Sequence, residues 1–307
     1  EILEVEIPSW SLAALGMYCA RLARVARRPS GARGFASEKE IRDRLSTIKN
    51  ISKVTKAMNM VAAAKLRKHQ DELEKAKAFA KGTEGLFFEV ESEKPTMVVP
   101  VSTDKGLCGG VNTFVNREAK FLMMDLQKQN KDFTLFTYGQ KSKGNLKRLF
   151  GKNMVGGIQD VGGGATTTFA EACEVADAIS AQEFGNCKMI YNSFVNIISY
   201  DTLTVSFPSL ADFEAEAETK FMAYEEEGDE GGLKKNFYEF LLATQIYGIL
   251  HNGQTCEQSS RMTAMDNSSS NADEMYDKLL LQANRVRQAK ITKELMEITG
   301  GAAAVQG

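Results

Sequence analysis

Apolar residues recur every three or four positions along the first ordered part of the chain. The stripe consists of Ile41, Leu45, Ile48, Ile51, Val54, Met58 and Val61, and it gives way to Ala62, Ala63 and Ala64. This spacing is that of one face of an α-helix. Ser37 and Glu40 stand three residues apart, as in a capping box, and predict where the helix starts. A stripe this narrow suits one partner helix rather than a globular core.

A second narrow stripe lies near the other end, with a spacing close to 3.5 residues. It consists of Met265, Ala272, Met275, Leu279, Val286, Ala289 and Met296, with polar Ser268, Gln282 and Lys293 completing the register. The segments Glu38–Lys81 and Gln254–Thr299 contain no glycine or proline, residues that cost about 1 and about 3 kcal/mol inside a helix. Each segment is therefore predicted to be a continuous helix of roughly 65–70 Å.

Neither long helix can bury its own stripe, and this predicts that the two helices pair. Because they come from opposite ends of one chain, we expect an antiparallel coiled coil. Polar residues in the seam predict only modest stability for the pair alone, which suggests that another structure encloses it.

The middle of the chain alternates strand-like and helix-like segments. Strands are predicted at Met97–Thr103, Phe133–Tyr138, Lys188–Val195 and Ile197–Phe207, and helices at Val111–Gln129, Gln140–Phe150 and Thr167–Gln182. This order predicts a small Rossmann-like α/β domain. The fold class is thus α/β, with a long antiparallel coiled coil of N- and C-terminal helices and the α/β domain between them. The predicted parts are a leader (1–35), an N-terminal coiled-coil helix (36–94), the α/β domain (95–210), an acidic linker (211–232) and a C-terminal coiled-coil helix (233–307).

Charge is unevenly distributed, although the net charge is only −2. The stretch from Arg44 to Gln70 has seven Lys or Arg residues and no acid, whereas Asp212 to Glu230 has nine acids and one lysine. The first helix is therefore a basic rod, and the segment before the last helix is acidic and solvated. No run approaches the ~18 consecutive apolar residues of a membrane span, so any membrane association is expected to come through a partner.

The five cysteines are widely spaced and form no C-x-x-C pair, which indicates a reducing compartment. With two histidines in the chain, a His/Cys metal site is not expected.

Residues 7–37 have the composition of a targeting segment. They include no acid, and five arginines are interleaved with alanine and leucine. This composition is typical of a mitochondrial transit peptide, and we expect cleavage at about Ala36. The alternative is a basic arm that stays attached. Met17 begins a well-formed presequence, so residues 1–16 are expected to lie before the translated chain.

Two glycine-rich loops are the first candidates for chemistry. Gly106–Gly110 follows a strand and opens a helix, a position at which backbone N–H groups can bind phosphate. It lacks the G-x-G-x-x-G and G-x-x-x-x-G-K-[ST] patterns, and the run 162–165 is not followed by lysine. Tight turns in a nucleotide-free domain are the favoured interpretation. Cys108 has Lys105 nearby but no histidine close in sequence, which disfavours a nucleophile. No catalytic residue or cofactor is predicted, and an enzyme acting on a phosphorylated ligand stays an alternative.

The basic first helix could also contact nucleic acid, because phosphate neutralisation needs clustered Lys and Arg. Aromatic residues for base stacking are missing from Glu38 to Ala78, and the chain as a whole is not basic. A positive rod that meets acidic loops of a surrounding protein fits better. At the other end, Glu297–Val305 is small and apolar. It is either a frayed tail or a smooth tip that turns inside an apolar collar.

Long motifs at both ends resemble the gamma subunit of the F-type ATP synthase. They are R-x-R-L-x-x-I-K-N-I (42–51), K-V-T-K-A-M-x-M-V-A-A-A-K (53–65), D-K-G-L-C-G-G (104–110), E-Q-S-x-R-M-x-A-M-D-N (257–267), N-R-x-R-Q-A-x-I-T-x-E-L (284–295) and G-A-A-A (301–304). The resemblance covers residues 38–305. Two departures are Lys105, where many relatives have arginine, and the lack of the cysteine-bearing insertion of the chloroplast form.

The resemblance implies a non-catalytic rotor on the matrix side of the mitochondrial inner membrane. The coiled coil would sit inside a hexamer of alternating alpha and beta subunits. The α/β domain would stand on the membrane c-ring beside the small central-stalk subunits (delta and epsilon), and proton-driven rotation would drive ATP synthesis on the beta subunits. By similarity, Lys53, Lys56 and Met58 lie near acidic loops of beta, and Arg287 and Gln288 hydrogen-bond a beta loop. Positions tied to coupling are matched by Arg261, Thr292 and Glu294.

Overall fold

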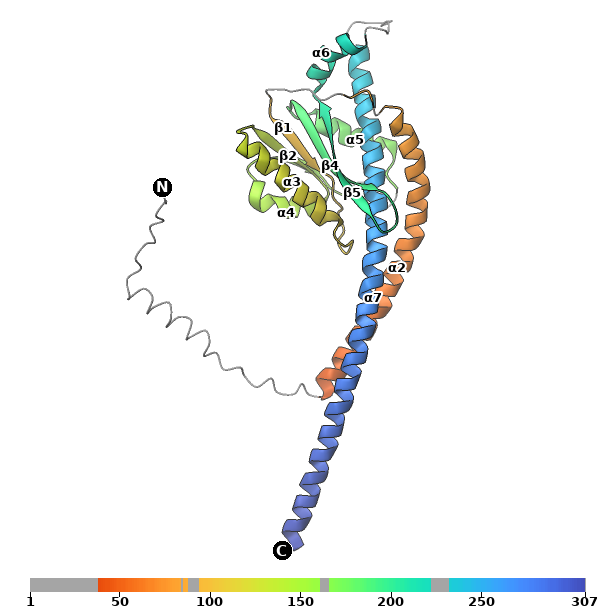
Figure 1. Ribbon diagram of the computed structural model, residues 1–307, viewed down its shortest axis with the longest axis vertical. Coiled ribbons are helices and arrows are strands. Elements are labelled where there is room, and N and C mark those ends of the chain that lie inside the picture. The colour runs from red at the N-terminus through yellow and green to blue at the C-terminus, as the bar shows by residue number, and fades with distance from the viewer. Residues whose placement is uncertain (1–37, 84, 88–93, 161–165, 222–231, 307) are drawn as a thin grey trace, which may run out of the picture. The chain divides into compact units, whose positions relative to one another are not determined.

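The computed structural model describes residues 38–306 except 84, 88–93, 161–165 and 222–231 (Figure 1). The predicted leader, the cap at Ser37 and the run 162–165 lie outside the described residues. In chain order the elements are α2 (Glu38–Lys81), β1 (Thr96–Pro100), α3 (Val111–Lys128), β2 (Phe133–Tyr138), α4 (Gln140–Phe150), β3 (Met154–Ile158), α5 (Phe169–Ser180), β4 (Asn186–Phe194), β5 (Tyr200–Pro208), α6 (Leu210–Lys220) and α7 (Gly232–Gln306).

The chain divides into two compact units. The larger unit comprises residues 49–274 and contains the sheet, and the smaller unit is built from residues up to 48 and those from 275 onward. Helices α2 and α7 each contribute a segment to both units.

The five-stranded sheet of the larger unit has the order β3-β2-β1-β4-β5. The first four strands are parallel, and β5 returns antiparallel to β4 as a hairpin that runs from Asn186↔Pro208 to Phe194↔Tyr200. Parallel strands need helical crossovers, which α3, α4 and α5 supply. The carboxyl ends of β1 and β2 therefore open on one edge of the sheet, where the loop after β1 lies.

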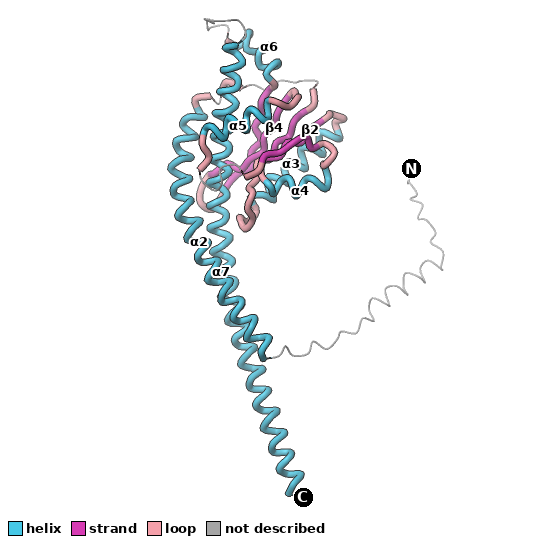
Figure 2. The backbone as a smooth tube through the Cα atoms, turned by 180° about the vertical axis from the view of Figure 1, so that it is seen from behind, coloured by secondary structure: helices cyan, strands magenta, loops and turns pink. Residues whose placement is uncertain are grey.

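The sheet separates two apolar layers. On one face, Val98 and Leu135 pack with residues of α3 and α4, including Met123 and Leu146. On the other face, side chains of β1, β4 and β5 pack against α5, α6 and the first part of α7 (Figure 2). The α7 residues in this second cluster are Tyr238, Leu241, Leu242, Ala243, Ile246, Ile249 and Leu250. The first part of α7 is thus a layer of the α/β core.

Helix α7 extends beyond the glycine-free run Gln254–Thr299 at both ends. It passes through Gly248 and Gly253 and continues beyond Thr299 through Gly300 and Gly301. At Gly248 and Gly253, burial of the large side chains around them, at about 25 cal/mol per Å², outweighs the roughly 1 kcal/mol cost of a helical glycine. A Cβ on Gly248 would stand 3.0 Å from the Cβ of Ala80. This glycine therefore lets α2 approach α7 closely.

In the larger unit, α2 presents a different face to α7 from the one predicted. The buried positions are Ser52, Thr55, Ala62, Leu66, His69, Leu73 and Ala76, and together with half-buried Asn59 they recur at spacings of three and four as in a heptad seam. Ile51, Val54 and Val61, expected in the seam, are exposed on the outside of the helix. The seam accepts polar residues because they are bonded across it: Ser52 Oγ donates to Asp273 Oδ1 (2.7 Å), and Asn59 Nδ2 donates to the carbonyl oxygen of Met262 (3.0 Å).

The smaller unit contains the start of α2 and the last part of α7. Ile41 is fully buried there, and half-buried side chains accompany it at Leu45, Ile48, Tyr276, Leu279, Ala283 and Val286. Lys290 Nζ lies 3.6 Å from Glu38 Oε2. Met275, Ala289 and Met296, which were predicted in the stripe, are exposed, as are residues 291–304. The paired seam of this unit thus ends near the first turn of α2.

Three further elements differ from prediction. Strand β3 was missed because it contains Gly156 and Gly157, yet a Cβ on Gly157 would lie 2.3 Å from Thr137 Oγ1, so only glycine fits. Strand β5 begins at Tyr200 because Asn196 Oδ1 accepts the N–H groups of residues 198 and 199 in a turn. The segment predicted as an acidic linker begins as helix α6, capped by Ser209 and anchored by buried Phe213.

The predicted fold class is confirmed: a mostly parallel α/β sheet is combined with two long helices that come from either side of it in the sequence and run antiparallel to each other. No helix among the described residues is long and apolar enough to cross a membrane.

Candidate functional site

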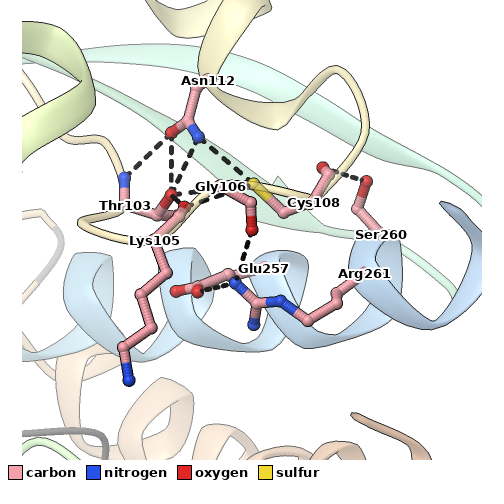
Figure 3. A network of polar contacts seen from close by, with 8 residues as sticks. All are labelled: Thr103, Lys105, Gly106, Cys108, Asn112, Glu257, Ser260 and Arg261. Carbon is pink, nitrogen blue, oxygen red and sulfur yellow. Dashed lines mark hydrogen bonds and ion pairs between the residues drawn. The ribbon is translucent and has the colours of Figure 1, made fainter. Parts of the chain in front are cut away.

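The loop after β1 is fixed internally by Asn112, in the first turn of α3. Asn112 Oδ1 accepts the backbone N–H of Thr103 at 2.9 Å, and Asn112 Nδ2 donates to Thr103 Oγ1 at 2.8 Å and to Cys108 Sγ at 3.2 Å (Figure 3). Thr103 Oγ1 in turn donates to the carbonyl oxygen of Lys105 at 2.7 Å. One buried amide therefore holds both ends of the loop and the thiol between them.

The same loop is attached to α7 through its carbonyl oxygens. Ser260 Oγ donates to the carbonyl of Cys108 at 2.7 Å, and Arg261 donates to the carbonyl of Gly106 at 3.4 Å. Arg261 also forms an ion pair with Glu257 one turn earlier, and its side chain is only 12% exposed. We call this set of contacts the loop clamp: Glu257, Ser260 and Arg261 of α7 with the carbonyls of Gly106 and Cys108.

The clamp explains the glycine at position 109. Gly109 has φ +60°, a conformation that residues with a Cβ rarely adopt, and an added Cβ would lie 2.7 Å from Ser260 Oγ. Asp104 fixes the other side of the loop by accepting the N–H groups of Gln140 (2.9 Å) and Asp160 (3.1 Å).

This geometry bears on the phosphate-binding alternative. A phosphate loop directs backbone N–H groups at the ligand, whereas here the carbonyls of Gly106 and Cys108 are directed at α7. Cys108 is buried, and its sulfur contacts Thr103 and Asn112. The loop therefore has the features of a structural joint.

A groove of about 350 Å³ runs beside the clamp, along the outer face of α2. Its lining combines apolar and basic side chains: Val54, Ala57, Met58, Val61, Ala62, Lys65, Lys105, Gln258 and Arg261. Val54 and Val61 are each 58% exposed. Figure 3 shows that Lys105 points away from the network that holds its loop. The described lining includes three cations and no acid, a combination that fits an acidic segment with apolar side chains.

The structure brings together only some of the residues predicted as partner contacts. Met58 and Arg261 both line the groove, and Arg261 is engaged within the chain. Lys53 is exposed on α2, and Lys56 Nζ lies 2.9 Å from Asp273 Oδ2.

The remaining predicted contacts, on the exposed last part of α7, belong to the smaller unit: Arg287, Gln288, Thr292 and Glu294. Thr292 Oγ1 donates to the carbonyl oxygen of Gln288 (3.0 Å), and Glu294 lies 3.9 Å from Lys290.

Sequence reasoning missed Glu257 and Ser260. The Glu257–Arg261 spacing of four on a predicted helix was a usable signal for the ion pair. The contact of Ser260 with a loop far away in sequence had no local signal.

Comparisons with known proteins give a consistent result. A family model described as ATP synthase matches residues 37–305. The chain is 37% identical over 281 residues to "ATP synthase subunit gamma, mitochondrial" of Drosophila melanogaster, covering 89% of this chain and 92% of that protein. It is 38% identical over 277 residues to "ATP synthase F(1) complex subunit gamma, mitochondrial" of Rattus norvegicus, covering 88% and 100%.

Two solved structures resemble the chain. A chain from the central stalk/c-ring of the Tetrahymena thermophila mitochondrial ATP synthase is 30% identical, with a TM-score of 0.59 over 70% of this chain and 99% of that one. A chain from the Euglena gracilis mitochondrial ATP synthase OSCP/F1/c-ring structure shares the fold, with a TM-score of 0.76, 19% identity and coverage of 89% and 95%.

We predict that Gly109→Ala loosens the loop and exposes the thiol of Cys108. The left-handed conformation alone costs a residue with a Cβ about 1–2 kcal/mol, and the clash with Ser260 Oγ adds to it. The measurement is the reaction rate of Cys108 with a thiol reagent, read by mass spectrometry of its peptide. In the double variant Gly109→Ala, Ser260→Ala we expect partial recovery, because the clash is removed and the backbone strain is not. A Cys108 rate equal to wild type in Gly109→Ala would contradict the clamp.

Proposed function

The chain belongs to the ATP synthase gamma-subunit family, and we propose that it is the central-stalk rotor of a mitochondrial F-type ATP synthase. In this role it transmits torque from a proton-driven c-ring to a hexamer of alpha and beta subunits, beside small central-stalk subunits (delta and epsilon). It acts on the matrix side of the inner membrane without spanning it. The observation that carries the proposal is the family match over residues 37–305, which includes both long helices and the domain between them.

We propose that the chain itself is non-catalytic and that ATP is made on its partners. The loop that would be the best candidate for binding a phosphate is instead clamped to α7 through its carbonyls. What the chain provides is a pair of antiparallel helices whose seam is bonded across at several levels. These bonds include Asn59 to Met262 and Gln245 to the carbonyl oxygen of Ala80 (3.0 Å).

We propose that the groove along α2 receives an acidic, partly apolar segment of the hexamer. The groove is lined by Met58, Lys65 and Lys105, and Lys53 is exposed on α2. Opposite charge attracts the segment over distance, while exposed Val54 and Val61 supply the apolar area that a complex would bury. Lys56 is paired with Asp273, so we assign it a smaller share of this attraction.

The last part of α7 is proposed to be enclosed by the hexamer. Its exposed apolar side chains are Ile291, Leu295, Met296 and Ile298. Apolar residues exposed along a helix in this number mark an interaction surface. Arg287, Gln288, Thr292 and Glu294 lie on the same exposed segment and are the polar groups that we propose contact the partner there.

We predict that Arg287→Ala combined with Gln288→Ala leaves the chain folded and assembled but lowers coupled ATP turnover about fivefold or more, the loss typical of hot-spot residues. Turnover is measured in the complex reconstituted with the variant, and circular dichroism verifies folding. Lys128→Ala is the control, because Lys128 is an exposed lysine on α3 that pairs with Asp125 (2.9 Å) and lies outside the segment proposed to be enclosed. Full turnover in the double variant would refute these contacts.

A second prediction concerns Lys105. Lys105→Glu places an acid against an acidic partner and is expected to weaken binding of the chain to the hexamer roughly threefold to tenfold at low salt. Lys105→Arg keeps the charge and should bind as the wild type does. Binding is measured by titration at two ionic strengths, because screening should narrow the difference. Equal affinities of Lys105→Glu and wild type at low salt would show that the groove is not the docking site.

A further inference from the structure

The two histidines of the chain, 182 positions apart in sequence, meet in the interior of the larger unit. His69 of α2 is 6% exposed, and His251 of α7 is 1% exposed. The hydroxyl of Thr255 lies between their backbones, 3.3 Å from the carbonyl oxygen of His69 and 2.8 Å from that of His251. The pair therefore stands in the seam where α2 packs on the part of α7 that belongs to the α/β core.

The hydrogen bonds of His251 define its neutral form. Its Nε2 lies 3.1 Å from the carbonyl oxygen of Thr167, which can only accept, so Nε2 carries the hydrogen. Its Nδ1 is then a bare acceptor, and this atom has no hydrogen-bond partner in the structure. The ring is held by an edge contact with Tyr247, at 4.4 Å between centroids. Thr167 is fixed in turn by Gln254 Nε2, which donates to its hydroxyl at 2.6 Å.

Two more polar atoms at this place have no hydrogen-bond partner. They are Nδ1 of His69 and Oε2 of Glu72, one turn further along α2. Three of the six buried side-chain polar atoms recorded as unpartnered among the described residues thus belong to this cluster. Buried polar atoms are nearly always hydrogen-bonded in native structures, so a cluster of unpaired ones calls for an explanation such as a functional role. Both histidines and the Glu72 side chain therefore carry an unpartnered polar atom in the same part of the seam.

The charged groups around the pair come from several elements. On α2, the carboxylate of Glu72 favours the charged form of both histidines and raises their pKa. Lys65 and Lys68 disfavour the charged form of His69 and lower its pKa. The cavity that His69 lines also contains Asp104, Lys105, Asp160, Glu257 and Arg261. Burial is the largest influence and lowers the pKa of both histidines below 6.5, and each positive ring would further disfavour the other.

We propose that His69 and His251 form a proton-sensitive latch between α2 and α7: neutral, they let the helices pack, and protonated, they force the packing open around residues 66–73 and 247–255. The direction of the pH dependence follows from the difference in histidine pKa between the folded and the unfolded chain. A histidine whose pKa in the folded state is lowered stabilises the closed packing fully above its unfolded value of 6.5. That contribution is lost as pH falls from 6.5 through the folded-state pKa.

The latch is a property of the chain alone and goes beyond the proposed rotor role. In a rotor it would weaken the grip of α2 on the α/β domain when the surrounding compartment becomes acidic, so torque would be transmitted less well. Its failure and that of the rotor proposal are separable, because the test needs no partner and no ATP.

The test is hydrogen–deuterium exchange of the full chain between pH 5 and 8.5, read by mass spectrometry. Exchange at the imidazole C2 position reports the pKa of each histidine, and the two histidines fall in different peptides. We expect both values below 6.5. Amide exchange in 66–73 and 247–255, corrected for its intrinsic pH dependence, should rise as pH falls below 6.5, by up to about tenfold per pH unit for each histidine.

Variants separate the latch from a general loss of stability. His69→Gln keeps a polar side chain that does not titrate, and it should reduce the pH dependence of amide exchange in both segments to the part that His251 contributes alone. Lys75→Gln, which changes an exposed charge on the same helix that is not among the groups acting on either histidine, should keep the wild-type pH dependence. If His69→Gln does not fold, the pH dependence of exchange in the wild-type chain still tests the proposal. Histidines that titrate at or above 6.5, or amide exchange in the two segments that does not respond between pH 7.5 and 5, would overturn the proposal.

Discussion

The structure depends on helix α7, which packs both in the core of the α/β sheet and against helix α2. The first part of α7 buries Tyr238, Leu242 and Ile246 in the core of the α/β sheet, and the same stretch carries Gly248, where α2 comes close. Since a helix is stiff along its hydrogen-bonded axis, a force applied to the sheet is passed into α7 without a hinge loop. The α/β domain and the helix pair are therefore mechanically one body within residues 49–274.

A narrow seam follows from this arrangement. One helix face can be buried against α7, and in the larger unit that face includes a serine and an asparagine bonded across to α7 instead of a continuous apolar row. The apolar side chains of Val54 and Val61 consequently face outward beside Lys105 and Lys65. A helix pair with an apolar and basic outer face is suited to an assembly in which partners surround it.

Much of this could be predicted from the sequence, because the signals were local. The long helices, the alternation of strands and helices, and the pairing of the chain ends are properties of glycine-free runs and apolar periodicity. The family motifs supplied the function. The face of α2 that is buried could not be predicted, because Ile51 and Ser52 differ by one helical position and only α7 decides between them. Strand β3 was hidden by glycines that are needed for close packing on Thr137. The loop clamp and the histidine pair join positions far apart in sequence, and no local pattern marks either.

We propose that the chain works as a non-catalytic rotor inside its partners. The most direct measurement is to isolate the tagged chain from mitochondria and to assay ATP hydrolysis in the eluate and in the purified chain by itself. The account predicts that ATPase activity elutes together with alpha and beta subunits, and that the purified chain neither binds nor hydrolyses ATP. A chain that elutes without these subunits and turns over nucleotide on its own would contradict it.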